Sequence, residues 1–526
     1  MATALPCPTS DESAAPTLAP TLAPTLRTDT LAGSVLMLLG LTVIQRLVGF
    51  GRSVLFCRWL EPEQLGQWDM AQSFLVLASA VAVLAVPGVF GRYVEHYRQR
   101  GQLRTLLRGT ALACSGLGAI AVVTIYFGRR WFSALIFGMP DQAEVVAMLA
   151  AALAALLVFN FLAELFTALR LVRVVAFMQL ANGLLFAILG TSLLFGWQCS
   201  AASVVVAYGA AGLLTAAVAV WWLVPVWIHQ PVPRTPLAQR ALWTKIVPFA
   251  GWVLSGAVLA NLFTIVDRYM IVHFSGMPVD EALSQVGIYH SSRIVPMLMV
   301  SIALMLGTMI TPHLSHDWEA GRRRHVAVRL RLFLKLLTFG LTAAAAMVLL
   351  AAPLLFDVAF QGKFEGGREV LPWTLTYCIW FGLIMVSENF LWCAEKARLG
   401  SIALGVGLAA NVGLNLLLLP PLGLLGAVLA TTLANLVALG LVCAFNHRLG
   451  MRIDRGLWVV LALPLALPLG ATATLLALAA VALGAFRGVQ LLSAEERHEL
   501  TEGTAFYLQR FRRQAHALAS EESAAC

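Results

Sequence analysis

The sequence predicts an all-α protein that crosses a membrane many times, and two observations carry this prediction. Of the 526 residues, 60% are hydrophobic and only 12% are charged, whereas soluble domains hold about half apolar and a quarter charged residues. The apolar residues come in runs of about 20, the length a helix needs to cross a bilayer core of about 30 Å. Because lipid offers the backbone no hydrogen-bond partners, helices follow rather than open sheets.

Twelve apolar runs define the predicted core spans, in two sets of six. Tight turns rich in Gly, Pro and polar residues separate some of them, as at 196–200 and 419–423. The runs lie at 31–50, 69–90, 106–128, 145–166, 172–195, 201–228, 246–273, 286–311, 332–356, 370–393, 399–419 and 422–445.

A last apolar run, residues 457–486, is interrupted by Pro464, Pro468 and Gly470. At about 1.5 Å per residue this run is long for one span and short for two. It is predicted either as a tilted thirteenth helix or as a hairpin that brings the total to fourteen. The hairpin is favoured because it returns the basic tail to the cytoplasm.

The two ends of the chain differ from its apolar middle. The Pro-rich residues 1–30 are predicted as a disordered cytoplasmic tail. The tail at 487–526 is predicted as an amphipathic helix on the membrane surface, since Ser493 and Glu496 form a capping-box pattern. The predicted domains are the first tail (1–30), an N-lobe (31–240), a C-lobe (241–446), the extra span or hairpin (447–486) and the last tail (487–526).

The distribution of basic residues orients the spans. Counted together with the first turn of the next span, the connections after even-numbered spans carry 21 Lys or Arg residues, and those after odd-numbered spans carry 6. Because loops rich in Lys and Arg stay in the cytoplasm, the N-terminus is predicted to be cytoplasmic. The same distribution accounts for the net charge of +9, so nucleic acid is not an expected partner.

The two sets of spans look like copies of each other. The segment LGQW at 65–68 follows the first span, and VGIY at 286–289 follows the seventh, 221 residues later. The same offset carries Arg46 onto Asp267. Two six-helix lobes with the same topology are therefore predicted, with a binding site between them near the middle of the membrane.

Charged residues inside the predicted spans are the candidate functional residues, because each costs about 2.5–3.5 kcal/mol at the bilayer centre. The basic ones, Arg46, Arg268 and Arg293, outnumber the acidic ones, Asp267 and Glu388. Guanidinium groups suit phosphate oxygens, so the balance favours an anionic substrate. The alternative is that Asp267 forms a structural ion pair with Arg46 or Arg293. Asp267 and Glu388 are predicted to act in gating or ion coupling.

No motif indicates catalysis, a cofactor or a metal. The sequence has no phosphate-binding Gly loop with a following Lys, and no recognisable nucleophile beside a base. The segment HLSHD at 313–317 has ligand-like spacing, but it lies where a span ends and is predicted as a solvated loop. The protein is therefore expected to be a transporter, with no enzyme activity and no cofactor.

Several segments, in order along residues 30–446, resemble the polysaccharide-type flippases, which include the Wzx O-antigen flippases. These flippases belong to the multidrug/oligosaccharidyl-lipid/polysaccharide (MOP) exporter superfamily, which also holds the MATE-like transporters. In the turn that follows the first span, at 58–66, Glu61 and Leu65 stand where these flippases usually have Gly and Phe. The similar segments are RLVGFGR at 46–52, RWLEPEQLG at 58–66, VDRYM at 266–270, VGIY at 286–289, FQGKF at 360–364, NVGLN at 411–415 and PPLGLLGA at 420–427.

The resemblance implies two six-helix lobes in a V, a central cavity and alternating access. It implies a bacterial inner-membrane flippase that moves an undecaprenyl-pyrophosphate-linked oligosaccharide to the outer leaflet, for O-antigen, lipopolysaccharide or other surface polysaccharide synthesis. Arg46, Arg52 and Arg268 carry over as substrate-binding residues of the cavity, and the charge argument adds Arg293. The expected partners are membrane lipids and the lipid-linked oligosaccharide, with a polysaccharide polymerase or glycosyltransferases as further candidates.

Two other functions stay open. An ion-coupled multidrug antiporter of the same superfamily would depend on Asp267 or Glu388 and export cationic dyes. A non-transporting scaffold of a glycan-assembly complex would depend on the tail at 487–526 more than on the cavity.

Overall fold

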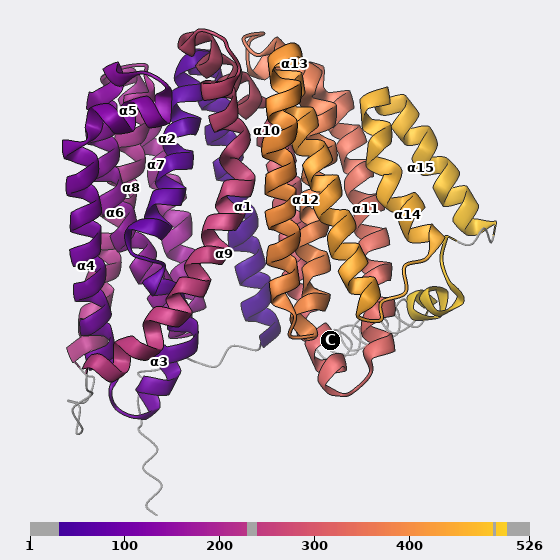
Figure 1. Cartoon of the computed structure of the whole chain (residues 1–526), viewed down its shortest axis with the longest axis horizontal. Coiled ribbons are helices and arrows are strands. Elements are labelled where there is room, and N and C mark those ends of the chain that lie inside the picture. The colour runs from indigo at the N-terminus through magenta and orange to yellow at the C-terminus, as the bar shows by residue number, and fades with distance from the viewer. Residues whose placement is uncertain (1–30, 229–238, 488–490, 502–526) are drawn as a thin grey trace, which may run out of the picture.

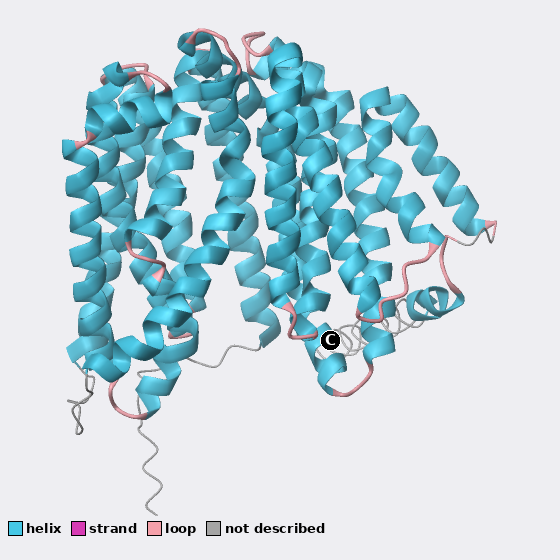
Figure 2. Cartoon of the chain, viewed as in Figure 1, coloured by secondary structure: helices cyan, strands magenta, loops and turns pink. Residues whose placement is uncertain are grey.

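The computed structural model describes residues 31–228, 239–487 and 491–501. Every regular element in this part is a helix, and Figure 2 shows no strand among the described residues. The prediction of an all-α, multi-pass membrane fold is confirmed. The tail predicted at 1–30 lies outside the described residues.

The first half of the chain forms eight α-helices and two short 3₁₀ turns (Figure 1). Their bounds are α1 Leu31–Trp59, α2 Pro62–Ala82, η1 Val86–Val89, α3 Phe90–Gln99, α4 Leu103–Phe127, α5 Arg129–Phe137, η2 Pro140–Gln142, α6 Ala143–Ala168, α7 Val172–Gly196 and α8 Ala201–Ile228.

The second half continues with seven α-helices and two short irregular helices. Their bounds are α9 Gln239–Phe274, α10 Val279–Glu319, α11 Arg323–Pro353, η3 Leu354–Ala359, α12 Glu365–Cys393, α13 Ala397–Arg448, α14 Arg455–Ala462, η4 Leu463–Leu469 and α15 Ala471–Phe486. The predicted division at 240/241 falls within the first residues of α9.

The first two spans differ from their predicted bounds. α1 ends at Trp59 rather than at residue 50, and α2 begins at Pro62 rather than at residue 69. Hydropathy marks only the apolar middle of a helix, whereas the helix itself continues until a residue such as Pro starts the next one. As a result, Arg52 lies inside α1, and Asp69 lies about two turns inside α2.

The second span is also bent. α2 and α3 meet at 61° across a break of a few residues. Leu84 and Ala85, within that break, both have φ of 50°, a left-handed conformation that residues other than glycine rarely adopt. The run predicted as one span at 69–90 is therefore two helical segments.

Nine helices of the described part are long and apolar enough to cross a membrane, and the bent α2–α3 pair makes a tenth. One of the nine, α13, has 52 residues and would measure about 78 Å if straight. It breaks at Gly423, where φ is 55° and ψ is −134°. The predicted twelve core spans are these ten, with α13 counted as two spans and α1 added.

The run at 457–486 forms the hairpin alternative. Gly470, with φ of 102°, separates η4 from α15, and Figure 1 shows α14 and α15 side by side at one edge of the molecule. Val460 and Leu463 pack with Leu478 of the returning helix, against Phe339 of α11. The chain thus returns to the side on which α1 begins.

The predicted capping box is present at the start of the tail helix, whose described part is residues 494–501. The amide of Ser493 donates to Oε2 of Glu496 at 2.8 Å, and the amide of Glu496 donates to Oγ of Ser493 at 3.3 Å. The rest of the tail, 502–526, lies outside the described residues.

The helices form two bundles (Figure 1). We call α1, α2, α4 and α6–α8 the N-bundle, and α9–α13 the C-bundle. The bundles meet where α2 crosses α10. A Cβ atom added to Gly66 would lie 1.8 Å from the carbonyl oxygen of Leu283, and one added to Gly287 would lie 1.8 Å from that of Pro62. These four residues form two pairs related by the 221-residue offset, so the repeat is a two-fold pseudosymmetry about this crossing.

Candidate functional site

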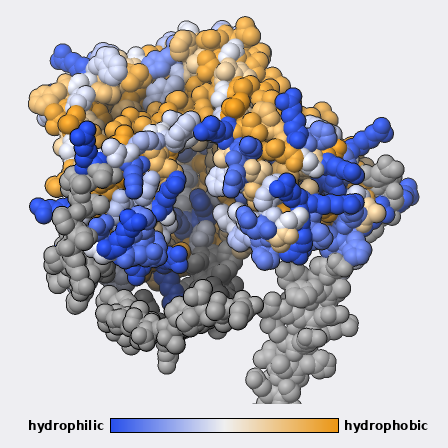
Figure 3. Space-filling view, turned by 60° about the horizontal axis from the view of Figure 1, so that its bottom comes forward, coloured by the Kyte–Doolittle hydropathy of each residue, from blue (hydrophilic) through white to orange (hydrophobic). Residues whose placement is uncertain are grey.

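A cavity of about 740 Å³ lies between the bundles, with walls from α1, α2, α7–α10 and α12. Figure 3, in which the bottom of Figure 1 comes forward, shows a hollow between the bundles on that face. α2 and α10 both begin near the top of Figure 1, and their glycine crossing brings the bundles into contact there. The cavity therefore lies below a closed contact.

The first helix places two arginines in the cavity wall, Arg46 and Arg52. The guanidinium carbon of Arg52 lies 4.2 Å from the centre of the Phe186 ring, a cation–π contact. Phe186 packs in turn against Tyr208, with ring centres 5.0 Å apart. Neither arginine forms an ion pair with another described residue, so both charges face the cavity without a counter-ion from the described part of the chain.

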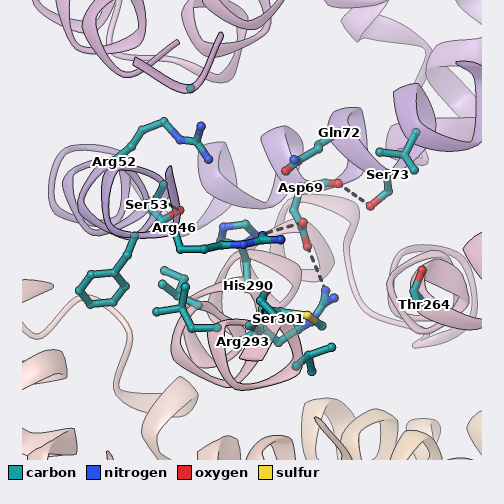
Figure 4. Close-up of a pocket in the computed structure, with 18 of the residues that line it drawn as sticks. Arg46, Arg52, Ser53, Asp69, Gln72, Ser73, Thr264, His290, Arg293 and Ser301 are labelled. Atoms are coloured by element: carbon teal, nitrogen blue, oxygen red, sulfur yellow. Dashed lines mark hydrogen bonds and ion pairs between the residues drawn. The ribbon is translucent and has the colours of Figure 1, made fainter. Parts of the chain in front are cut away.

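The cavity wall also holds a buried ion network around Asp69 of α2 (Figure 4). Oδ2 of Asp69 lies 2.9 Å from Nε of Arg268 and 3.8 Å from Nη1 of Arg293. Oδ1 lies 3.0 Å from Nδ1 of His290. Arg268 also donates to Oγ of Ser73, whose hydroxyl donates to the Asp69 carbonyl at 2.7 Å. One carboxylate of the N-bundle thus faces three basic side chains of the C-bundle.

Asp267 turns away from this cavity into the C-bundle. The hydroxyl of Tyr289 donates to Oδ2 of Asp267 at 2.5 Å, and the backbone amide of Arg268 donates to Oδ1 at 2.9 Å. Tyr289 is hydrogen-bonded in turn to Tyr377, 2.8 Å away. The structural ion pair predicted between Asp267 and Arg46 or Arg293 is not formed by these described residues. Asp69, already placed among the C-bundle arginines, provides that counter-charge instead.

Asp267 lines a second, much smaller pocket of about 20 Å³. This pocket lies inside the C-bundle and shares Arg293 with the main cavity. Its other polar walls include Thr431 and Asn435 of α13. The structure thus places Asp267 one layer behind the cavity wall.

Glu388 is not brought to the cavity. It is half-buried on α12, its Oε1 has no hydrogen-bond partner in the described structure, and it packs against Gly400 at the start of α13. The HLSHD segment is not a loop, because it lies in the last turns of α10. Its Asp317 is buried and paired with Arg322 at 2.8 Å and with Arg329. Among the described residues no group of three metal-ligating side chains exists.

Asp69 and His290 are not among the site residues predicted from the sequence. Asp69 stood at the predicted edge of a span, where a charge needs no explanation, because the start of α2 had been placed seven residues too late. The signal that could have found both is the repeat. Asp69 and His290 are separated by the same 221 residues as Gly66 and Gly287, so both sit beside the pseudosymmetry axis.

Solved structures with the same fold are transporters. The "Lipid II flippase MurJ, inward closed conformation" matches with a TM-score of 0.66 and 12% identity, over 86% of this chain and 98% of that one. An inward-facing multidrug resistance MATE transporter of the MOP superfamily matches with a TM-score of 0.59 and 14% identity, over 77% and 94%. The VcmN MATE transporter of Vibrio cholerae matches with a TM-score of 0.56 and 12% identity, over 80% of this chain and 96% of that one.

Sequence comparison adds a relative and a family. The uncharacterized membrane protein YabM of Bacillus subtilis (strain 168) is 23% identical over 390 residues, covering 71% of this chain and 72% of YabM. The family described as "Polysaccharide biosynthesis protein" matches residues 31–318. Fold and cavity together define a multi-pass membrane protein with the same fold as MurJ and the MATE transporters. Within that class, the chain belongs to the polysaccharide biosynthesis protein family.

Proposed function

We propose that this protein is a flippase that moves a lipid-linked, anionic oligosaccharide across the bacterial cytoplasmic membrane by alternating access. The observation that carries the proposal is the interbundle cavity with arginines from both bundles in its walls, two of which, Arg46 and Arg52, have no counter-ion from the described chain. An anionic headgroup supplies that counter-ion.

The chemistry of the cavity favours a phosphate or pyrophosphate headgroup. Arginine binds such groups through parallel N–H donors in a fixed plane, and charge-assisted hydrogen bonds contribute about 1.5–3 kcal/mol each. The family membership supports a glycan as the attached group, and the fold shared with a lipid II flippase supports a polyprenyl-linked carrier. We further propose undecaprenyl pyrophosphate as that carrier and O-antigen, lipopolysaccharide or a similar surface polysaccharide as the product.

The direction of transport follows from the proposed orientation. With the N-terminus in the cytoplasm, the side on which α1 begins is cytoplasmic, and the glycine crossing closes the outer side. The headgroup then enters from the cytoplasm while its polyprenyl chain stays in lipid. A polymerase or glycosyltransferases are the proposed partners on either side of this step.

The test measures lipid-linked oligosaccharide in each leaflet of cells that carry the protein, lack it, or carry a variant. Loss of the protein is expected to trap the oligosaccharide on the cytoplasmic face. Arg46→Ala and Arg52→Ala should each lower export about tenfold or more, from the loss of one charge-assisted contact. The control is Arg368→Ala, whose half-exposed side chain contacts Asp357 outside the cavity. Export that persists in both cavity variants refutes the proposal.

One observation favours a second function, an ion-coupled antiporter. Asp267 lines a small pocket behind the cavity, among polar residues of α13, where a cation could exchange. This function predicts that Asp267→Asn abolishes efflux of cationic dyes, with or without any effect on glycan export. Dye efflux that does not depend on the protein removes this alternative.

A further inference from the structure

Asp69 joins the two bundles electrostatically. α2 of the N-bundle carries it, whereas its partners Arg268, His290 and Arg293 all belong to the C-bundle. Asp69 is 3% exposed, Arg268 6% and Arg293 8%. Asp69 lies one turn along α2 from Gly66, where α2 touches α10. The carboxylate and the glycine crossing therefore hold the two bundles together at the same place.

The contact is close but incompletely bonded. Oδ2 of Asp69 accepts no hydrogen bond in the described structure, and the Nε atoms of Arg268 and Arg293 donate none. The 2.9 Å approach of Arg268 Nε to Asp69 is thus an ion pair without hydrogen-bond geometry. The neighbouring carboxylate of Asp267 does not take these donors, because Tyr289 and a backbone amide hold it.

A phosphate fits these donors better than the carboxylate does. It offers three or four oxygens in a tetrahedral arrangement where Asp69 offers two in a plane, and the planar guanidinium groups bind such oxygens in pairs. Buried donors that stay unbonded are costly, so an anion that satisfies them competes directly with Asp69. Both guanidinium groups line the cavity into which the headgroup enters.

We propose that the Asp69 carboxylate occupies the binding site of the substrate phosphate until the substrate enters the cavity. This inference rests on the proposed function and adds a mechanism to it. The phosphate displaces Asp69 from Arg268 and Arg293, and the loss of that interbundle contact frees α2 to part from α10 at the glycine crossing. Loading of the cavity and opening of the far side are thereby coupled through one carboxylate.

The first measurement is the dissociation constant of inorganic pyrophosphate for the purified full-length protein and its Asp69→Asn variant. A ligand that binds only the released state has its affinity reduced by the fraction of molecules in that state. If about 90% of molecules hold the Asp69 contact, the variant binds about tenfold more tightly. Asp357→Asn is the matched control, since this exposed aspartate pairs with Arg368 outside the cavity and its loss should leave the constant unchanged.

The second measurement is the distance between the bundles on the closed side. Spin labels are placed on the exposed native Cys199, after α7, and on a Glu365→Cys variant at the start of α12. Cys7, Cys393 and Cys526 are changed to serine. Pyrophosphate should add a longer-distance population to the wild-type protein, and Asp69→Asn should show that population without any ligand.

Each outcome decides one question. Tighter binding and a longer distance in Asp69→Asn support the exchange, and a return to weak binding on adding Arg293→Gln places it at this site. Equal or weaker binding by Asp69→Asn, or unchanged distances, overturns the exchange while the flippase proposal stands. If neither wild type nor variant binds pyrophosphate, both the proposed anionic substrate and the proposed exchange of phosphate for Asp69 are refuted. Should Asp69→Asn not fold, His290→Gln removes one of the same contacts and is expected to tighten binding about threefold.

Discussion

The glycine crossing of α2 and α10 gives the most quantitative prediction. In Gly66→Ala, the new methyl group would lie 1.8 Å from the Leu283 carbonyl oxygen and 2.8 Å from its carbon. Both are backbone atoms of a helix, so no side-chain rotation can relieve the overlap. To bring the closest contact to 3.0 Å, which real Cβ atoms rarely undercut, the helices must separate by about 1.2 Å.

The magnitude follows from the overlap. Overpacking of a close contact costs about 1–3 kcal/mol, at the upper end here because the new methyl group meets backbone atoms. The gain in helix propensity from Gly to Ala, about 1 kcal/mol, is the same in the closed and the separated state and cancels between them. A cost of about 3 kcal/mol therefore falls on the closed crossing, which shifts the equilibrium towards separated bundles by about 150-fold.

The assay is the label distance between Cys199 and Glu365→Cys described above, measured without ligand. Gly66→Ala should show a predominant longer distance. Gly287→Ala, which meets the Pro62 carbonyl oxygen at the same 1.8 Å, should show an equal effect. The double variant should cost little more than either single one, because one separation accommodates both methyl groups.

The matched control is Gly116→Ala in α4, where an added Cβ atom meets nothing within 4 Å. This variant should leave the distance unchanged and be neutral or slightly stabilising. If Gly66→Ala behaves like Gly116→Ala, the two helices are not in backbone contact, and the account of the closed side is wrong. Full additivity of the two crossing variants would equally refute the shared separation.

Two further predictions concern ion pairs at the two ends of the C-bundle. Glu496 is fully buried between Arg331 and Lys335, and its carboxylate lies 2.9 Å from the lysine nitrogen. Glu496→Gln should therefore weaken the docking of the tail helix by about 3–5 kcal/mol. The tail helix should then become accessible to trypsin. Lys363→Gln breaks an exposed interbundle pair with Glu61, 2.8 Å long, and should cost at most about 1 kcal/mol, a less than sixfold change in the label-distance populations.

The control for Glu496→Gln is Glu495→Gln, one residue earlier. Glu495 is exposed and pairs with Arg324 on the molecular surface. The Arg324 guanidinium lowers the pKa of Glu495 from its ordinary value, so their contact is present at neutral pH and is lost as the pH falls through that lowered value. Trypsin release in Glu495→Gln at neutral pH, equal to that in Glu496→Gln, would show that the buried network does not hold the tail.

Much of the fold could be predicted because lipid imposes a simple rule on sequence. A span must be apolar and about 20 residues long. Hydropathy along the sequence therefore predicts the positions of the helices and the interruption that becomes the α14–α15 hairpin. The capping box at Ser493 could also be predicted, because it depends only on residues three positions apart. The end of α1 and the start of α2 could not, since helices continue through polar residues at the membrane edge. Because α2 was predicted to begin at residue 69, Asp69 was not recognised as a residue inside a helix.

The cavity could be predicted only in part. Arg46, Arg52, Arg268 and Arg293 do line one cavity, because a charge inside an apolar span must face something other than lipid. Which carboxylate faces which arginine depends on the rotation and tilt of the helices, and hydropathy does not determine either. The wrong pairing of Asp267 arose there: its depth in the membrane is suitable, but α9 turns it toward Tyr289.

The pseudosymmetry explains which residues the two repeats share, and which they do not, where they meet. At a two-fold axis each residue faces its own counterpart, so Gly66 meets Gly287, and both must be small for the backbones to touch. A charged residue at such a position would meet a like charge if the repeats were identical, and burial would make that repulsion severe. The counterparts Asp69 and His290 are instead complementary, 3.0 Å apart. Divergence of the repeats at this one position thus converts a symmetric helix crossing into an interbundle contact that an anion can break.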